Sequence, residues 1–170
     1  IDSDADKSKF EILYSEYKNL MYYTANRILR NSSDAEDVVH QAFLKVIEIL
    51  DTISSPRCHK TRALLVTITE HKAIDLYREK QRRNVLPLAE EYIGAAPAAE
   101  IERLAARDTL AAAIAALPPR YRSVLLLRYD CGYSNAEIAN ILDTTEPNVR
   151  KLIQRAKEKL SAALSGMEEP

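Results

Sequence analysis

The sequence has no tryptophan, only three glycines and only two cysteines. It also has no apolar run near the roughly 20 residues that a membrane-spanning helix needs. Scarce glycine, together with frequent Ala, Leu, Glu, Lys and Arg, favours helix over sheet. The opening segment, IDSDADKSKF, is acidic and polar, unlike a signal peptide. We therefore expect an all-α protein with no stable membrane insertion.

The two cysteines, Cys58 and Cys131, form no CxxC motif. This predicts free thiols in a reducing, cytoplasmic compartment, with a disulfide between them as the less favoured alternative. His40, His59 and His71 match no zinc or hydrolase spacing, and no glycine-rich loop is present to hold a phosphate. An enzyme with a histidine-containing metal site is thus the weaker alternative. We expect no metal, no cofactor and no catalytic residues.

The net charge of −1 is the sum of unlike blocks along the chain. Residues 56–84 have eight Lys and Arg against three Asp and Glu, and residues 120–160 have eight against five. Residues 85–108, between these blocks, have two against five. Two basic blocks separated by an acidic one indicate two surfaces that face a polyanion, or simply two solvated helix faces.

Apolar residues recur every three or four positions in the first half of the chain, which is typical of amphipathic helices. They predict helices over residues 7–29, from about 33 to 50, and over 61–83, with a loop at 51–60. Three helices of this length enclose one small core. We expect a bundle of three to four helices over residues 1–84.

The second of these helices has a recognisable start. Ser33 is expected to cap it, and Asp34, Glu36 and Asp37 are expected in its first turn. Negative charge is favoured there because the amino end of a helix carries the positive end of its dipole.

A flexible linker is expected over residues 85–102, which contain two prolines, a glycine and an Ala/Pro tract. A second small helical domain is expected over residues 103–170. Its helical pattern runs to Ala116, breaks at Pro118-Pro119 and turns at Cys131-Gly132. The last two helices are predicted at 135–142 and 147–164.

These last two helices match the helix-turn-helix pattern, in which a short helix braces a longer one. Thr144 or Thr145 is expected to cap the longer helix, and Pro147 suits its first turn because no N–H donor is needed there. The outer face of the longer helix offers groups that pair with base edges or neutralise phosphates. These DNA-binding candidates are Asn148, Arg150, Lys151, Gln154, Arg155 and Lys157.

The segment LPPRYRSVLLLRYDCGYSNAEIANILDTTEPNVRKLIQRAKEKL resembles region 4 of the sigma-70 family of bacterial RNA polymerase sigma factors. The segments SDAEDVVHQAFLKVIEIL and TRALLVTITEHKAIDLYREKQRR resemble region 2. The two matches occur in family order with a linker between them, which is the layout of the extracytoplasmic-function (group 4) type. The resemblance implies a non-catalytic specificity subunit that directs promoter-specific initiation.

The resemblance also implies partners and residue roles. The chain would bind core RNA polymerase through the beta-prime clamp helices and the beta flap, bind promoter DNA, and be held inactive by an anti-sigma factor. The beta-prime contact would fall on Asp34, Glu36, Asp37, Gln41 and Phe43. The acidic linker would thread near the polymerase active-site channel and mimic nucleic acid.

Two promoter elements would be read. The loop at 51–60 and the helix after it match the part that opens and reads the −10 element, where a basic groove would hold unstacked bases. The groups implied there are Arg62, His71, Lys72, Arg78, Arg82 and Arg83. The surface that reads the −35 element in duplex DNA would include Arg150, Lys151, Gln154 and Arg155.

Three positions depart from the family pattern. Leu64 or Leu65 stands where region 2 often has tryptophan, and His71 stands where asparagine is common. Asp143 stands where many helix-turn-helix motifs have glycine, because the turn often needs a left-handed residue. Asp tolerates that conformation better than most residues do.

Two other readings remain beside this one. A helix-turn-helix transcriptional regulator would have an N-terminal sensing or dimerisation domain, which has no need of the basic end of the third helix. A purely protein-binding helical module overlaps with the sigma factor reading, because an anti-sigma factor would cover the same faces.

Overall fold

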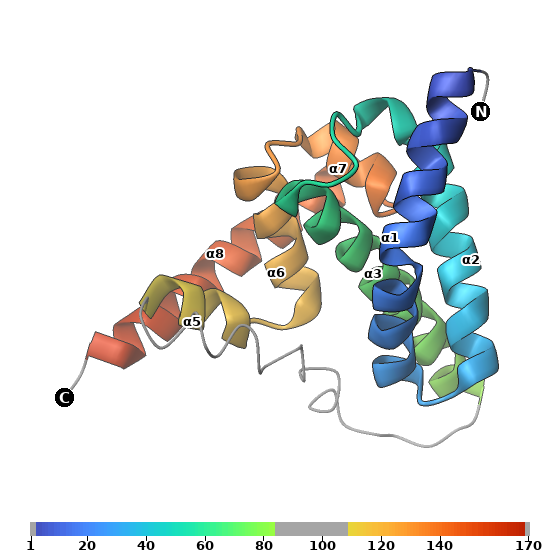
Figure 1. The fold of residues 1–170 in the computed structure, drawn as a ribbon. Coiled ribbons are helices and arrows are strands. Elements are labelled where there is room, and N and C mark those ends of the chain that lie inside the picture. The colour runs from blue at the N-terminus through green and yellow to red at the C-terminus, as the bar shows by residue number, and fades with distance from the viewer. Residues whose placement is uncertain (1–2, 84–108, 169–170) are drawn as a thin grey trace. The chain divides into compact units, whose positions relative to one another are not determined.

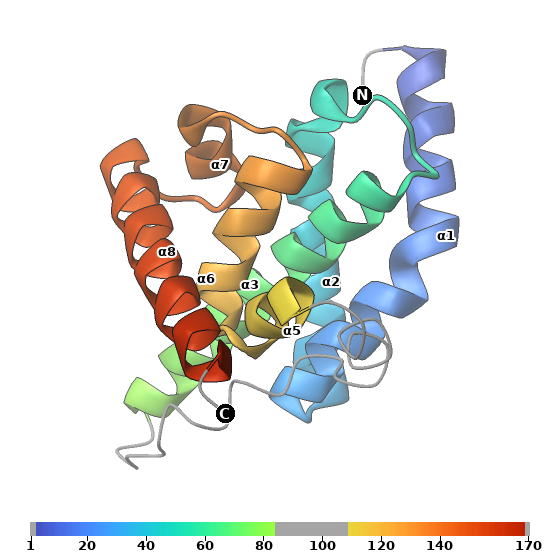
Figure 2. The ribbon, with the colours of Figure 1, turned by 90° about the vertical axis from the view of Figure 1, so that its left-hand side faces the viewer.

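The computed structural model describes residues 3–83 and 109–168 (Figures 1 and 2). Their regular structure is helical, and they include no strand, so the all-α prediction is confirmed. The chain divides between Pro87 and Leu88 into two compact units. The predicted linker at 85–102 and the first residues of the predicted second domain lie outside the described residues.

Three helices form the N-terminal unit (Figure 1): α1 (Asp4–Leu29), α2 (Ser32–Glu48) and α3 (His59–Arg83). A short 3₁₀ helix, η1 (Leu50–Thr52), follows α2. Each of the three α-helices packs against the other two. Lys9, near the start of α1, donates to the carbonyl of Leu50 just after α2, so these two helices run in opposite directions. The predicted bundle is confirmed.

The start of α2 differs from the prediction by two residues. Asn31, in an extended conformation, accepts the N–H of Asp34 at 3.0 Å through its side chain and is the cap. Ser33 is already helical, so the prediction that Ser33 caps the helix was wrong. With this earlier start only Asp34, and not Glu36 or Asp37, lies in the first turn. Asn is at least as good a helix cap as Ser, and Asn31 precedes Ser33 in the chain, so the helix begins at the earlier cap.

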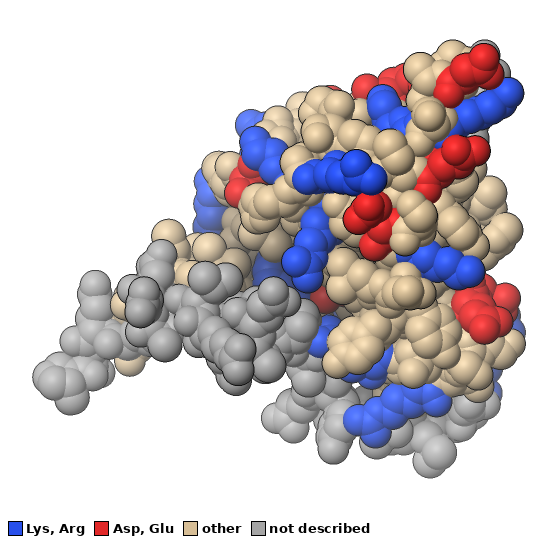
Figure 3. Space-filling model, in the orientation of Figure 1, with Lys and Arg blue, Asp and Glu red and all other residues tan. Residues whose placement is uncertain are grey.

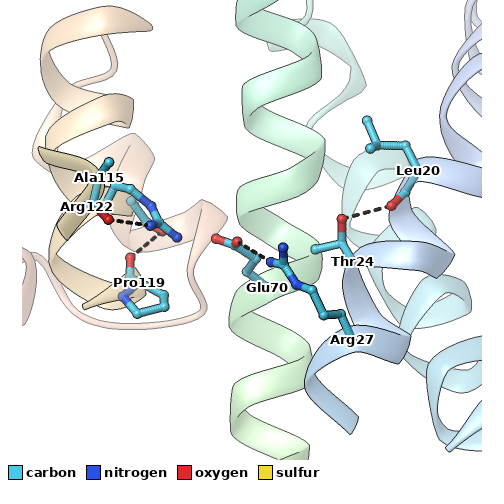
Figure 4. A network of polar contacts seen from close by, with 8 residues as sticks. Leu20, Thr24, Arg27, Glu70, Ala115, Pro119 and Arg122 are labelled. Carbon is cyan, nitrogen blue, oxygen red and sulfur yellow. Dashed lines mark hydrogen bonds and ion pairs between the residues drawn. The ribbon is translucent and has the colours of Figure 1, made fainter. Parts of the chain in front are cut away.

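The core of this unit consists of apolar side chains at helical spacing. The largest fully buried ones are Leu13, Met21, Val46, Ile53, Leu64, Leu65 and Ile68. Two buried threonines are satisfied within their own helices: Thr24 donates to the carbonyl of Leu20 at 2.8 Å (Figure 4), and Thr69 donates to that of Leu65. Polar side chains therefore enter this core without leaving unpaired hydroxyls.

One ion pair joins α1 and α3 in a largely buried position. Arg27 Nη2 lies 3.9 Å from Glu70 Oε1, with side chains only 23 % and 6 % exposed (Figure 4). A buried ion pair is weak evidence for stability because desolvation offsets the attraction. It does fix the rotational setting of the two helices, because neither charge tolerates burial without a partner.

The C-terminal unit contains α5 (Thr109–Ala116), α6 (Pro119–Leu125), α7 (Asn135–Ile141) and α8 (Glu146–Glu168). The π-helical segment η3 (Leu126–Asp130) continues α6. The long helix α8 packs against α5, α6 and α7. It is thus the central element of the unit, and Figure 2 shows it beside α6 and α7.

The predicted break at Pro118-Pro119 is confirmed, because Pro118 precedes α6 and Pro119 is its first residue. The corner is held from inside: the buried Arg122 donates to the carbonyl of Ala115 at 3.2 Å (Figure 4), and the buried Ser123 donates to that of Pro119 at 2.7 Å. The sequence did not reveal this role of Arg122, which belongs to the second basic block but faces inward.

No helix in the described parts of the chain is both long and apolar enough to cross a membrane.

The cap of α2 yields a matched pair of substitutions. Asn31→Ala is expected to lower the free energy of unfolding by about 1 kcal/mol, because the Asp34 N–H loses its acceptor. Ser33→Ala is expected to change it by less than about 0.5 kcal/mol. Urea denaturation followed by circular dichroism measures both, and equal losses in the two variants would contradict the assignment of Asn31 as the cap.

Candidate nucleic-acid interface

The helix-turn-helix begins with a capping box that the sequence prediction missed. Ser134 Oγ accepts the N–H of Glu137, and the Glu137 carboxylate accepts the N–H of Ser134 at 2.7 Å. This backbone hydrogen bond holds the pKa of Glu137 below its usual range. Its stabilisation is therefore present above the unfolded-state pKa and is lost as pH falls through the lowered value. The spacing S-x-x-E was the available signal.

The turn between α7 and α8 contains a left-handed residue at the predicted position. Asp143 has φ +50, which confirms that Asp adopts here the conformation for which glycine is common. The N–H of Thr144 then bonds to the carbonyl of Ala139 at 2.9 Å. Ala139 itself is buried where the two helices meet. Thr145 stands just before α8, and its carbonyl accepts from Val149 at 3.0 Å.

The two faces of α8 separate as predicted. Val149, Leu152, Ile153 and Ala156 are buried, and the side chains predicted to contact DNA are all exposed. Those exposed side chains are Asn148, Arg150, Lys151, Gln154, Arg155 and Lys157. The structure thus brings this set onto one solvent-facing surface of one helix, which we call the α8 surface.

Carboxylates accompany the cations on the α8 surface. Arg150 Nη2 lies 2.6 Å from Glu146 Oε1, and Gln154 donates to Glu158 at 3.1 Å. Both acidic residues are four positions away on the same helix. An exposed pair of this kind contributes little to stability. It does restrict the Arg150 side chain and lowers the positive potential that a phosphate meets.

A depression of about 360 Å³ adjoins the α8 surface, and its lining adds residues that the prediction missed. Arg128 and Tyr129 come from η3, and Tyr129 is 60 % exposed. The Lys157 ammonium lies 5.2 Å from the centre of the Tyr129 ring, within the range of a cation–π contact. Arg150 and Gln154 line the same depression. The clue in the sequence was the pair Arg128-Tyr129, which stands just before the turn at Cys131-Gly132.

The cations predicted for the −10 element do not form one cluster. Arg62 is exposed in the first turn of α3, whereas Arg82 and Arg83 are exposed in the last. At 1.5 Å of rise per residue the two ends are about 30 Å apart. The half-buried members, His71, Lys72 and Arg78, lie along the helix between these ends. These cations are therefore spread along the length of α3 and around more than one of its faces.

The residues predicted to bind the polymerase fall into two groups. Glu36, Asp37 and Gln41 are exposed on α2. Asp34, with a side chain only 17 % exposed, forms an ion pair with Lys80 at the end of α3. Phe43 is buried, and its ring centre lies 5.8 Å from that of Phe10 and 4.9 Å from that of Tyr14. Phe43 thus supports the surface rather than projecting from it.

These rings belong to a groove between α1 and α2 with a volume of about 630 Å³. We call it the α1/α2 groove. Its apolar rim is exposed at Tyr14 (41 %) and Leu44 (44 %), and Lys18 and Glu36 add charge of both signs. In Figure 3 acidic side chains lie among basic ones over the N-terminal unit. An apolar groove with mixed charge suits a helical protein partner better than a polyanion.

Cysteine and histidine form no reactive cluster. Neither Cys58 nor Cys131 forms a disulfide, as predicted. A hydrogen bond between the Thr61 side chain and Cys58 Sγ, together with one from the Thr61 backbone N–H, lowers the pKa of the Cys58 thiol. His59 and His71 are twelve residues apart on α3, and His40 is on α2. Within the described ranges, His, Cys, Asp and Glu side chains form no group of three that would hold a metal ion.

Comparison with known proteins gives each unit a family. The profile of Sigma-70 region 2 matches residues 13–83, and that of Sigma-70 region 4 matches residues 107–160. The chain belongs to the sigma-70 family, and its relatives are of the extracytoplasmic-function (ECF) type. ECF RNA polymerase sigma factor SigW of Bacillus subtilis is 27 % identical over 94 % of this chain and 90 % of its own length. ECF RNA polymerase sigma factor SigL of Mycobacterium tuberculosis is 28 % identical over 94 % and 91 %.

Among solved structures, CnrH in complex with the cytosolic domain of CnrY matches with a TM-score of 0.40 and 26 % identity, over 92 % of this chain and 88 % of that one. The two profile matches confirm the family resemblance predicted from the sequence for both regions. Because region 2 covers α1 to α3, the reading of the N-terminal unit as a sensing or dimerisation domain is not favoured.

Glu146 yields a prediction for the α8 surface. Glu146→Gln removes a carboxylate beside Arg150, so binding to non-specific duplex DNA is expected to tighten several-fold at low salt. The dependence of log affinity on log salt is expected to steepen by about 1, as one more phosphate is neutralised. Fluorescence anisotropy over a range of KCl concentrations measures both quantities. Asp4→Asn, which removes the exposed pair with Lys7, is the control. If it changes the DNA affinity and its salt dependence as much as Glu146→Gln does, the effect does not come from the α8 surface.

Proposed function

We propose that this chain is the promoter-specificity subunit of a bacterial RNA polymerase, which binds the core enzyme and directs initiation at promoters with −10 and −35 elements. The observation that carries the proposal is that regions 2 and 4 match in family order, each on its own helical unit. The chain acts as a non-catalytic subunit in the cytoplasm, where its polymerase partner works.

The two units divide the task. We assign core polymerase and −10 binding to residues 1–84, a connecting role to residues 85–102, and −35 binding to residues 103–170. Each DNA surface alone is weakly basic, so binding by the free chain is weak and falls with salt. Once polymerase fixes their separation, the two contacts gain avidity from the raised effective concentration.

Polymerase binding is assigned to the α1/α2 groove and the exposed polar residues beside it. Glu36, Asp37 and Gln41 offer charge and hydrogen bonds, and the groove offers apolar area. Phe43 acts by shaping the groove floor, and Asp34 by holding α2 to α3. An anti-sigma factor that covers this groove or the α8 surface would keep the chain inactive.

The −10 and −35 elements are assigned to different helices. The −35 element meets the α8 surface, where Arg150 and Gln154 have the groups for paired hydrogen bonds with base edges. The −10 element meets the loop before α3 and Arg62 beside it. Arg82 and Arg83, about 30 Å further along the helix, would contact the DNA backbone beyond that loop.

The groove assignment is tested by a charge placed on its rim. Leu44→Glu is expected to weaken binding to core polymerase more than tenfold, because a carboxylate would be desolvated against apolar surface. The fold is expected to persist, since Leu44 is 44 % exposed. Tyr23→Glu, at a residue 63 % exposed on α1 that does not line the groove, is the matched control. Size-exclusion binding assays with purified core enzyme measure both, and equal affinities would refute the assignment.

The −35 assignment is tested by run-off transcription over a promoter library with purified core enzyme. Arg150→Ala is expected to lose about 1–3 kcal/mol of discrimination at one base pair of the −35 element. Lys151→Ala is expected to weaken all promoters alike, as loss of a phosphate contact does. If the wild-type chain directs initiation at no promoter, the proposed function is wrong; if Arg150→Ala keeps full −35 discrimination, only its role is wrong.

A further inference from the structure

The loop of residues 53–58, between η1 and α3, is held by a helix far away in the sequence. The Tyr17 hydroxyl on α1 donates to the carbonyl of Pro56 at 2.9 Å. Its neighbour Glu16 accepts from Arg57, with 3.1 Å between Oε1 and Nε. Two consecutive residues of α1 thus hold two consecutive residues of the loop.

The loop is also fixed at both of its ends. Ile53 is 2 % exposed and anchors the start of the loop in the core. At the other end, the Thr61 hydroxyl donates to the carbonyl of Ser55 at 2.6 Å, and the Thr61 N–H donates to Cys58 Sγ at 3.4 Å. With the contacts from α1 in the middle, the loop is held at both ends and at its centre.

The two contacts from α1 differ in strength. The Glu16–Arg57 pair has side chains 45 % and 68 % exposed, so solvent screens it. The hydrogen bond of Tyr17 is partly buried, and burial is the main cause that raises the pKa of Tyr17. A partly buried hydrogen bond contributes more than an exposed ion pair. Tyr17 is therefore the main tether.

The same turn of α1 also lines the α1/α2 groove. Tyr14 and Lys18, on either side of Tyr17 in the sequence, both line it, and the Lys18 ammonium lies 5.1 Å from the centre of the Tyr14 ring. A loop tied to this turn keeps a fixed place relative to any partner that fills the groove. The tether therefore links the position of the loop to the bound polymerase.

We propose that Tyr17 and Glu16 are positioning residues for reading the −10 element, because they hold the 53–58 loop in the shape that accepts unstacked bases. The inference rests on the proposed function, which assigns this loop to the −10 element. A preformed loop loses less conformational entropy when it binds than a loose one does. Neither residue needs to touch DNA for this effect.

The test uses holoenzyme assembled from core polymerase and the full chain, on promoters with single changes in the −10 or the −35 element. Tyr17→Phe removes only the hydroxyl. Its discrimination among −10 variants is measured as the ratio of the rates of open-complex formation on the original and the changed −10 elements. This ratio is expected to fall about three- to tenfold. Discrimination among −35 variants and affinity for core polymerase are expected to stay unchanged. Glu16→Gln is expected to give a smaller loss of the same kind.

Tyr23→Phe is the matched control, the same chemical change at an exposed residue of the same helix. In the free chain, amide hydrogen exchange over residues 53–58 is expected to speed up in Tyr17→Phe and not in Tyr23→Phe. Unchanged −10 discrimination in Tyr17→Phe, or an equal loss at −10 and −35, overturns the inference while the proposed function stands. If the wild-type holoenzyme starts transcription at no promoter, the proposed function is wrong. If amide exchange over residues 53–58 is no faster in Tyr17→Phe than in the wild type, the Tyr17 hydrogen bond is not needed to hold the loop.

Discussion

Burial of one apolar stripe on each helix is the constraint on which both functional surfaces depend. On α8 the stripe of Val149, Ile153 and Ala156 is enclosed by the other helices of its unit. Successive helical residues differ by about 100° in direction, so the same packing turns Arg150 and Lys151 toward solvent. The α8 surface therefore exists because its opposite side is buried, and a shift of one residue would turn it away.

On α3 and α8, the two helices proposed to contact DNA, carboxylates offset part of the positive charge. On α8, Glu146 and Glu158 lie four residues from the groups that would read bases. On α3 the cations are spread along and around the helix, and Lys80 and Arg83 are paired with carboxylates. Such surfaces attract DNA weakly and depend on salt. This suits a subunit whose specificity should appear only in the assembled polymerase, where the tethered units act together.

The N-terminal unit combines on one framework the groove proposed to bind polymerase and the loop proposed to read the −10 element. Aromatic packing of Phe43 against Phe10 and Tyr14 shapes the α1/α2 groove, and the next turn of α1 holds the loop before α3. Rigid support of this kind keeps a short recognition loop in one conformation. In the proposed function, polymerase binding and base reading would thereby share the helix α1.

The sequence by itself determined the helices, the division of the α8 faces and the left-handed turn at Asp143, because these follow from spacing and from local backbone preference. It placed the cap of α2 at Ser33 instead of Asn31, since both residues suit a cap and only hydrogen-bond geometry separates them. The apolar spacing left open whether Phe43 or Leu44 faces the core, and it gave no sign that Asp34 pairs with Lys80 or that Tyr17 reaches Pro56. Those contacts join residues about 30 to 50 positions apart, and only the packing of helices brings such residues together.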